Sequence, residues 1–267
     1  SELRGEWGGE MLEIDATGKV QRSLGLKLPK AGQDVKLTLD LELQLTAEKV
    51  LSDKVGGAIV ALDPRTGAIR AIASQPTFDL NFFSKPFTQN QYDDLFFSSN
   101  RPLLSRALNA YDPGSTWKPI TAIAGMESGK FPATRKLNTV PCLRYGSHCF
   151  PEYNKRGYGR IGYEDALRVS SNTFFYQVGV GAGSKALYDA ATKLGFDNYT
   201  GIEIVFDENK GLVGNKTWAD QGRGWAKPGE TPWIVEDMAS ASIGQSVVLV
   251  TPLQLARAYA VFANGGY

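Results

Sequence analysis

The clearest pattern of apolar positions is a pair of short runs, Gly57–Asp63 and Ala68–Ser74, that are rich in Ile, Val and Ala. The segment 64–67 joins them and places Pro and Gly where a tight turn favours them. We predict a β-hairpin here, buried on most of its surface. Upstream, residues 34–40 alternate with period two, which predicts a further strand, and Asp40 is placed to cap a helix that runs to about residue 52.

Helical spacing dominates the second half of the chain, with Gly129 and Gly195 as stop signals and Thr251 before Pro252 as a start signal. The residues between 75 and 110 lack periodicity, and we interpret them as a long ordered connection with short helices. Two Gly-rich polar stretches, 138–162 and 207–233, predict loops. The predicted helices cover residues 115–128, 163–169, 173–180, 184–194 and 251–264.

The bulk properties exclude some functions. The chain has 267 residues and a net charge of +1, so nucleic acid is not an expected partner. No apolar run reaches the ~18 residues that span a bilayer. Residues 1–33 read as a linker or the edge of an N-terminal domain. Neither end resembles a natural terminus, so we expect a fragment of a longer chain.

Two cysteines, Cys142 and Cys149, are separated by six residues in a predicted loop. An even pair of this kind fits a disulfide in an oxidising compartment, although two free thiols stay open. The only histidine, His148, lies beside Cys149. A zinc site needs about four ligands, and these three leave it one short, so we predict no metal.

Because the only histidine lies in a loop beside a cysteine, we do not expect a Ser-His-Asp triad. A hydrolase or acyltransferase here therefore needs another base. Ser115 begins a predicted helix after Pro113-Gly114, where free N–H groups favour negative charge. Lys118 is one turn further on the same face. A partly buried lysine there has a lowered pKa and accepts the serine proton. The alternative is a helix-capping serine beside a solvated lysine.

A second polar element interrupts an apolar helical stretch at Ser170-Ser171-Asn172. It is either a simple turn between two helices or the edge of a cleft. In the second interpretation Ser170 relays a proton and Asn172 forms hydrogen bonds to a peptide amide.

Together these elements match the Ser-x-x-Lys and Ser-x-Asn motifs of the serine penicillin-recognising enzymes. The wider chain resembles one branch, the class B penicillin-binding proteins, and leans towards its cell-elongation type. The segments that carry the resemblance are Leu3-Arg-Gly5, Leu37-Thr-Leu-Asp40, Gly57-Ala-Ile-Val-Ala-Leu-Asp-Pro-Arg-Thr-Gly67, Ala73-Ser-Gln-Pro76, Pro113-Gly-Ser-Thr-Trp-Lys-Pro119, Ser170-Ser-Asn-Thr173 and Ile243-Gly-Gln245.

The resemblance implies an α+β fold with an antiparallel sheet between helices. It also implies a peptidoglycan D,D-transpeptidase without a cofactor. Residues 1–33 would then border an N-terminal pedestal domain, and 34–267 would form the transpeptidase domain without its C-terminal strands. Ser115 would attack the D-Ala-D-Ala carbonyl of a stem peptide, with Lys118 as general base and Ser170 and Asn172 beside them. β-Lactams would acylate the same serine. The family acts on the outer, periplasmic face of the cytoplasmic membrane, through an anchor absent from this sequence. A membrane glycosyltransferase of the elongation machinery is the expected partner.

The third motif of this family, Lys-Thr-Gly or its Ser variant, does not occur in these 267 residues. We therefore expect this chain alone to be inactive. Some elongation enzymes hold a metal near a Cys in the middle of the second motif. That position is Ser171 here, so we carry no metal over. The competing interpretations are a β-lactamase or β-lactam sensor, and a non-catalytic cell-wall scaffold with the same fold.

Overall fold

The computed structural model describes residues 2–202, 207–223, 227–229 and 232–266, and it divides into two compact units, residues 1–39 and 40–267. The first unit contains a 3-10 helix and an antiparallel hairpin whose strands are exposed along their whole length. Asp15 organises its turn by accepting hydrogen bonds from the backbone N–H groups of Thr17 and Lys19. The elements are the 3-10 helix Glu2–Arg4, β1 (Gly9–Ile14) and β2 (Val20–Lys27).

The second unit begins with α1 (Leu41–Leu51), which packs against the predicted hairpin. Asp40 caps it, as predicted, by accepting a 3.0 Å hydrogen bond from the N–H of Leu43. The predicted strand at 34–40 is wrong: the structure assigns no strand there. Alternation makes a segment suitable for a sheet, but a strand also needs a neighbouring strand, and none of the described strand pairs includes these residues.

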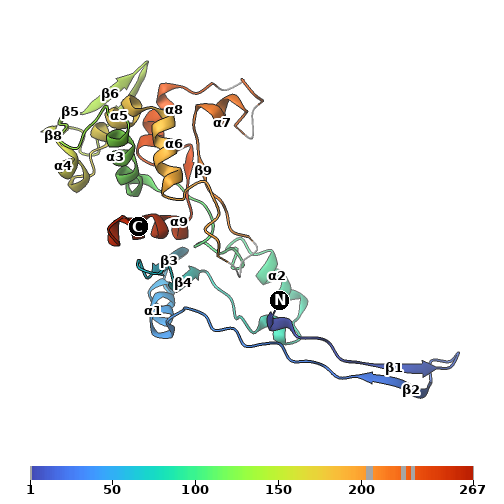
Figure 1. The fold of residues 1–267 in the computed structure, drawn as a ribbon. Coiled ribbons are helices and arrows are strands. Elements are labelled where there is room, and N and C mark those ends of the chain that lie inside the picture. The colour runs from blue at the N-terminus through green and yellow to red at the C-terminus, as the bar shows by residue number, and fades with distance from the viewer. Residues whose placement is uncertain (1, 203–206, 224–226, 230–231, 267) are drawn as a thin grey trace. The chain divides into compact units, whose positions relative to one another are not determined.

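The hairpin consists of β3 (Gly57–Leu62) and β4 (Ile69–Gln75), paired antiparallel, which confirms the prediction. α1 packs against β4, and α9 (Pro252–Ala263) packs against β3. Figure 1 shows the hairpin between these two helices. This arrangement confirms the expected α+β fold, with antiparallel strands between helices. The last helix begins as predicted, because Thr251 forms a capping box with Gln254.

A group of helices surrounds the main core. α3 packs against both α5 and α6, and α5 also packs against α8. The contact between α5 and α8 requires Gly179, because a Cβ there would lie 1.8 Å from the Oγ of Ser242. These elements are α3 (Lys118–Glu127), α5 (Asn172–Ala182), α6 (Ser184–Lys193) and α8 (Val235–Ser242). Sequence periodicity predicted the first three and missed α8.

The predicted loop at 138–162 is wrong, because it contains two small antiparallel pairs. β5 (Leu137–Thr139) pairs with β8 (Gly159–Ile161), and β6 (Cys142–Tyr145) pairs with β7 (His148–Pro151). Strands of three or four residues are too short to show a period-two pattern. The predicted loop at 207–233 likewise contains short elements. The remaining elements are the 3-10 helix Phe82–Ser84, α2 (Gln89–Phe96), α4 (Tyr163–Arg168), β9 (Leu212–Val213), α7 (Lys216–Asp220) and β10 (Val248–Leu249).

Within the described residues, no helix has the length and apolar character needed to cross a membrane.

Candidate active site

Ser115 lies on a single 3-10 turn, Gly114–Trp117, that leads directly into α3. Its side chain is exposed, whereas Trp117 beside it is fully buried in the helical core. The turn is held by a 2.9 Å hydrogen bond from the N–H of Gly114 to the carbonyl of Gly244. A Cβ on Gly244 would lie 2.5 Å from the Gly114 carbonyl oxygen, so this close approach requires glycine.

Lys118 is the first residue of α3 and is almost completely buried, with 1% of its surface exposed. Its Nζ donates hydrogen bonds to the carbonyl of Ser170 (2.6 Å), the Oγ of Ser170 (2.9 Å) and the Oδ1 of Asn172 (2.7 Å). Burial lowers the pKa of Lys118 to about 8, while the negative charge of Glu152 partly opposes the shift. The amine is therefore much easier to deprotonate than a lysine in solvent.

The structure joins three of the four predicted site residues directly: Lys118 bonds to both Ser170 and Asn172. It shows no hydrogen bond between the Oγ of Ser115 and the Nζ of Lys118, although one helical turn separates the two residues. Catalytic hydrogen bonds often tighten only when substrate binds. A neutral amine has one N–H fewer and gains a lone pair, so loss of the Lys118 proton frees Nζ to accept the Ser115 proton.

The second motif forms a tight turn between α4 and α5. Ser170 has a φ of 53°, in the left-handed region that residues other than glycine rarely adopt. Ser171 follows as the N-cap of α5 and accepts a hydrogen bond from the N–H of Phe174 (3.3 Å). The turn aims both the carbonyl and the Oγ of Ser170 at Lys118. The strained residue is therefore the same residue that accepts two hydrogen bonds from the lysine.

Sequence reasoning missed one residue at this turn. Glu152 is 1% exposed and follows β7, about twenty residues before the turn that it contacts. Burial alone raises the pKa of Glu152, but hydrogen bonds from Ser171, Asn172 and other donors outweigh it and hold the pKa below its usual range. The carboxylate is therefore ionised at neutral pH. No local pattern marks Glu152, because its partners are distant in sequence.

Cys142 and Cys149 lie on the paired strands β6 and β7, where their Sγ atoms are bonded and their Cα atoms are 5.8 Å apart. His148 is the first residue of β7. Its Nδ1 lies 3.3 Å from the Oε1 of Glu236 on α8. No group of three or more His, Cys, Asp or Glu residues is arranged to hold a metal within the part of the chain that the structure describes.

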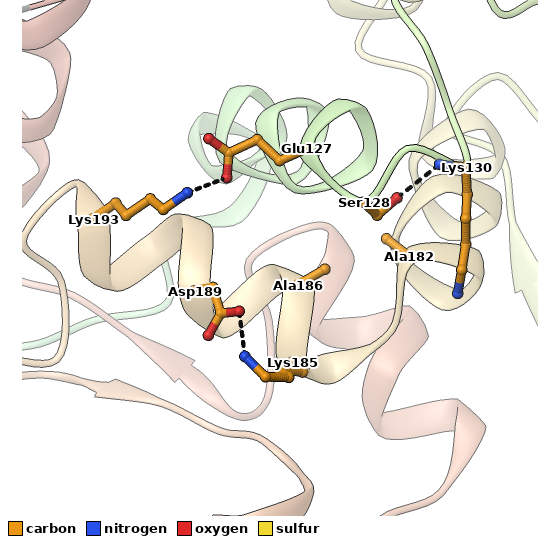
Figure 2. Close-up of a pocket in the computed structure, with 8 residues that line it drawn as sticks. All are labelled: Glu127, Ser128, Lys130, Ala182, Lys185, Ala186, Asp189 and Lys193. Atoms are coloured by element: carbon orange, nitrogen blue, oxygen red, sulfur yellow. Dashed lines mark hydrogen bonds and ion pairs between the residues drawn. The ribbon is translucent and has the colours of Figure 1, made fainter.

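A shallow pocket lies elsewhere, between the end of α3 and the helix α6 (Figure 2). An ion pair from Lys193 to Glu127 (2.8 Å) joins the two helices, and a second one, from Lys185 to Asp189 (2.6 Å), lies along α6. None of the site residues lines this pocket. Its lining residues are Glu127, Ser128, Lys130, Ala182, Lys185, Ala186, Asp189 and Lys193.

A comparison with protein families agrees with this geometry. Residues 57–267 match the penicillin-binding protein transpeptidase domain. The chain belongs to this family. Among curated relatives, it is 35% identical to the peptidoglycan D,D-transpeptidase MrdA of Acinetobacter baumannii, across 99% of this chain and 38% of the relative. It is 33% identical to MrdA of Escherichia coli, across 99% of this chain and 41% of the relative. The chain thus spans well under half the length of these relatives.

Solved penicillin-binding proteins share the fold. A complex between the penicillin-binding protein PBP2 and MreC from Helicobacter pylori matches with a TM-score of 0.83 and 28% identity, over 99% of this chain and 48% of that one. PBP2 of Pseudomonas aeruginosa, in complex with the compound WCK 5153, matches with a TM-score of 0.82 and 31% identity, over 93% of this chain and 52% of that one. These matches confirm the expected resemblance to class B penicillin-binding proteins of the elongation type.

Proposed function

We propose that this chain carries the acylation centre of a peptidoglycan D,D-transpeptidase, with Ser115 as nucleophile. One observation supports this function above others: Lys118 is buried against Ser170 and Asn172, one helical turn after the exposed Ser115. A lysine whose pKa is lowered to about 8 is a suitable base for a serine hydroxyl. Two comparisons support this assignment. The chain belongs to the transpeptidase family, and it is 35% identical to a protein named peptidoglycan D,D-transpeptidase MrdA.

In the proposed reaction, the Oγ of Ser115 attacks the carbonyl carbon of the penultimate D-Ala of a stem peptide. Neutral Lys118 accepts the hydroxyl proton. The amide C–N bond then breaks, and Ser170 relays a proton from Lys118 to the departing D-Ala amine. Asn172 forms hydrogen bonds to the peptide amide, and the N–H of Ser115 contributes to stabilising the oxyanion. An amine from a second stem peptide attacks the ester, which restores Ser115. A β-lactam enters the first step in place of the stem peptide.

The 267 residues contain no Lys-Thr-Gly or Lys-Ser-Gly sequence. In members of this family, that sequence lies on a strand. The strand supplies the second N–H that binds the oxyanion and a donor that binds the substrate carboxylate. We propose that acylation by this chain depends on such a strand being supplied, and that the 267 residues alone react slowly or not at all. A comparison of the 267-residue chain with the complete natural protein tests this dependence directly.

We also propose that the protein works at the outer face of the cytoplasmic membrane, beside a glycosyltransferase. Related solved structures include the complex of PBP2 with MreC and a peptidoglycan synthase complex that coordinates polymerization and crosslinking. An oxidising location is also where a Cys142–Cys149 disulfide persists. Copurification of the complete natural protein with a membrane glycosyltransferase tests the partner.

The test of the activity uses the complete natural protein, a synthetic stem pentapeptide as donor and a peptide amine as acceptor. We expect release of D-Ala together with a cross-linked product, and neither in the Ser115→Ala variant. Ser52→Ala, at the exposed end of α1, serves as the matched serine control and keeps both products. Failure of the wild-type protein to release D-Ala, while folded, would contradict the proposal.

The same preparation separates the two competing functions. A serine β-lactamase would hydrolyse a β-lactam with many turnovers and would keep no adduct. A scaffold would form no adduct at all. We expect a covalent adduct that persists for many minutes, because the chain belongs to a transpeptidase family, and in the proposed reaction an amine, not water, resolves the acyl-enzyme.

A further inference from the structure

The carboxylate of Glu152 accepts four hydrogen bonds from the turn at residues 171–173. Its carboxylate accepts hydrogen bonds from the Oγ of Ser171 (2.6 Å), the N–H of Asn172 (2.7 Å) and the Oγ1 of Thr173 (2.8 Å). The N–H of Thr173 adds a longer contact of 3.2 Å. Three consecutive residues are therefore bound to one buried carboxylate that comes from a different part of the chain.

The backbone that carries Glu152 is itself fixed. The N–H of Glu152 donates a 2.9 Å hydrogen bond to the carbonyl of Pro141, which extends the pairing of β6 with β7. On the other side, the N–H of Val140 donates to the Oγ1 of Thr173 (3.3 Å). Phe150 anchors the hairpin by packing edge to face on Tyr176 of α5. The carboxylate is therefore held in place by the hairpin and does not depend on a flexible side chain alone.

The position of the carboxylate suits a helix start. The first N–H groups of an α-helix have no partner within the helix, and the helix dipole favours a negative charge there. Glu152 satisfies the N–H groups of Asn172 and Thr173, and the Oγ of Ser171 satisfies that of Phe174. The start of α5 is thus completely bound by side chains and cannot shift without breaking several hydrogen bonds.

We propose that Glu152 is a positioning residue for acylation: its carboxylate fixes the turn 170–173 so that the Oγ of Ser170 and the Oδ1 of Asn172 face the Nζ of Lys118. This inference rests on the proposed function of Ser115 and Lys118. It assigns a role to a residue outside the sequence motifs. Glu152 touches neither the substrate nor the reacting atoms, and it acts through Ser171, Asn172 and Thr173.

Glu152 also acts on Lys118 by its charge. Its negative charge raises the pKa of Lys118 against the lowering by burial, and it adds to burial, the larger cause, in raising the pKa of Tyr176 on α5. Removal of the charge at constant shape should therefore lower the pKa of Lys118 further, and the pH at which acylation reaches half of its maximum should fall.

The test compares Glu152→Gln, Glu152→Asp and wild type in the complete natural protein. Gln keeps the shape but loses the charge and half of the acceptor positions. Asp keeps the charge but moves it one methylene away. Thr251→Ala is the matched control, because it removes a buried N-cap from another helix, α9, and leaves the charge near Lys118 unchanged. Thermal unfolding identifies variants that fail to fold, and the kinetics are measured well below each Tm.

We measure the rate of covalent labelling by a fluorescent penicillin as a function of pH. We expect Glu152→Gln to lower the maximal rate by ~10- to 100-fold, because small displacements of a catalytic constellation have effects of this size. Its pH midpoint should fall by at least ~0.5 unit. Glu152→Asp should recover part of the rate and the wild-type midpoint. Thr251→Ala should lower Tm without shifting the midpoint. Equal rates and midpoints in Glu152→Gln and wild type would overturn the proposal.

A second readout does not depend on activity. The 13Cε resonance of Lys118, assigned by comparison with Lys118→Arg, reports the titration of the amine by NMR. A lower midpoint in Glu152→Gln supports the inference even if wild type forms no adduct at Ser115, in which case only the proposed function fails. An unchanged Lys118 titration with unchanged amide exchange at the start of α5 contradicts the inference even if Ser115 is acylated.

Discussion

Two helix starts meet at the candidate site, and they are built in opposite ways. No side chain caps the 3-10 turn of Ser115 or the start of α3 that follows it. The start of α5, by contrast, is bound by the Oγ of Ser171 and by the buried carboxylate of Glu152. An uncapped start leaves N–H groups available for negative charge that develops during a reaction. A helix start whose N–H groups are already bound, as in α5, holds the residues of its turn in fixed positions. We infer that the turn of Ser115 provides the reacting group, whereas the turn at the start of α5 positions the groups around Lys118.

Lys118 connects the two starts, and its replacement should have the largest effect. Lys118→Arg keeps a positive charge but cannot lose its proton, so it cannot accept the proton of Ser115. We expect acylation by a fluorescent penicillin to fall by about 1000-fold, the range typical for loss of a general base. Lys130→Arg is the control, because Lys130 is an exposed lysine whose Nζ donates to the carbonyl of Gly181 (2.8 Å). Wild-type acylation in Lys118→Arg would break the comparison.

The strained residue of the second turn separates geometry from chemistry. Ser170→Ala and Ser170→Gly both remove the Oγ that bonds to Lys118, and we expect each to lower acylation by about 100-fold. Their stabilities should differ, because glycine adopts a φ of 53° without the ~1 kcal/mol cost that alanine meets. Ser170→Gly should therefore unfold at the higher Tm. Identical unfolding curves would show that the left-handed turn is not strained.

The proton state of Lys118 predicts how acylation depends on pH. The pKa is lowered to about 8 by burial, so the amine is charged below this pH and becomes neutral above it. At pH 7 about one molecule in ten is ready to accept a proton, and the rate should rise about tenfold up to a plateau above pH 9. Stopped-flow labelling between pH 6 and 10 measures this profile. A midpoint near the ordinary lysine value would mean that Lys118 is solvated.

The acid range tests the other helix start. The pKa of Glu152 lies below its usual range, so the folded state holds this proton less tightly than the unfolded chain. Its stabilising effect is complete above the ordinary glutamate pKa and is lost as pH falls through the lowered value. Urea midpoints of wild type should therefore fall more steeply below pH 4 to 5 than those of Glu152→Gln. Parallel curves would contradict this.

The hairpin that carries Glu152 should contribute the smallest effect. Closing a loop of eight residues with a disulfide stabilises a fold by ~2.5 kcal/mol in the chain-entropy model. The double variant Cys142→Ser and Cys149→Ser should therefore unfold at a lower urea concentration. It should acylate faster than Glu152→Gln, because the backbone pairing of β6 with β7 remains. An intact mass that shows two free thiols in wild-type protein from the periplasm would refute the bond itself.

The same contrast explains what sequence reasoning achieved. Ser115 and Lys118 lie three residues apart, so a local motif and helical spacing were enough to propose their relation. The hairpin β3–β4 and the helix starts at Asp40 and Thr251 were likewise determined by neighbouring residues. Whole-chain motif order identified the family, which no single motif would have done.

The failures have the opposite origin. The alternation at 34–40 was real, but no strand pairs with it among the described residues. β5 to β8 were too short to leave a periodic trace. Glu152 depends on contacts with a turn about twenty residues away, and its surroundings in sequence resemble an ordinary loop. Contacts of this kind arise from the tertiary fold and are invisible to local patterns.

One measurement tests the central claim most directly. The complete natural protein is labelled with a fluorescent penicillin, digested, and its labelled peptide is sequenced by mass spectrometry, with Ser115→Ala treated in parallel. We expect a single stable adduct on the Oγ of Ser115 and no label in the variant. An adduct on another residue, or none on a folded wild-type protein, would contradict it.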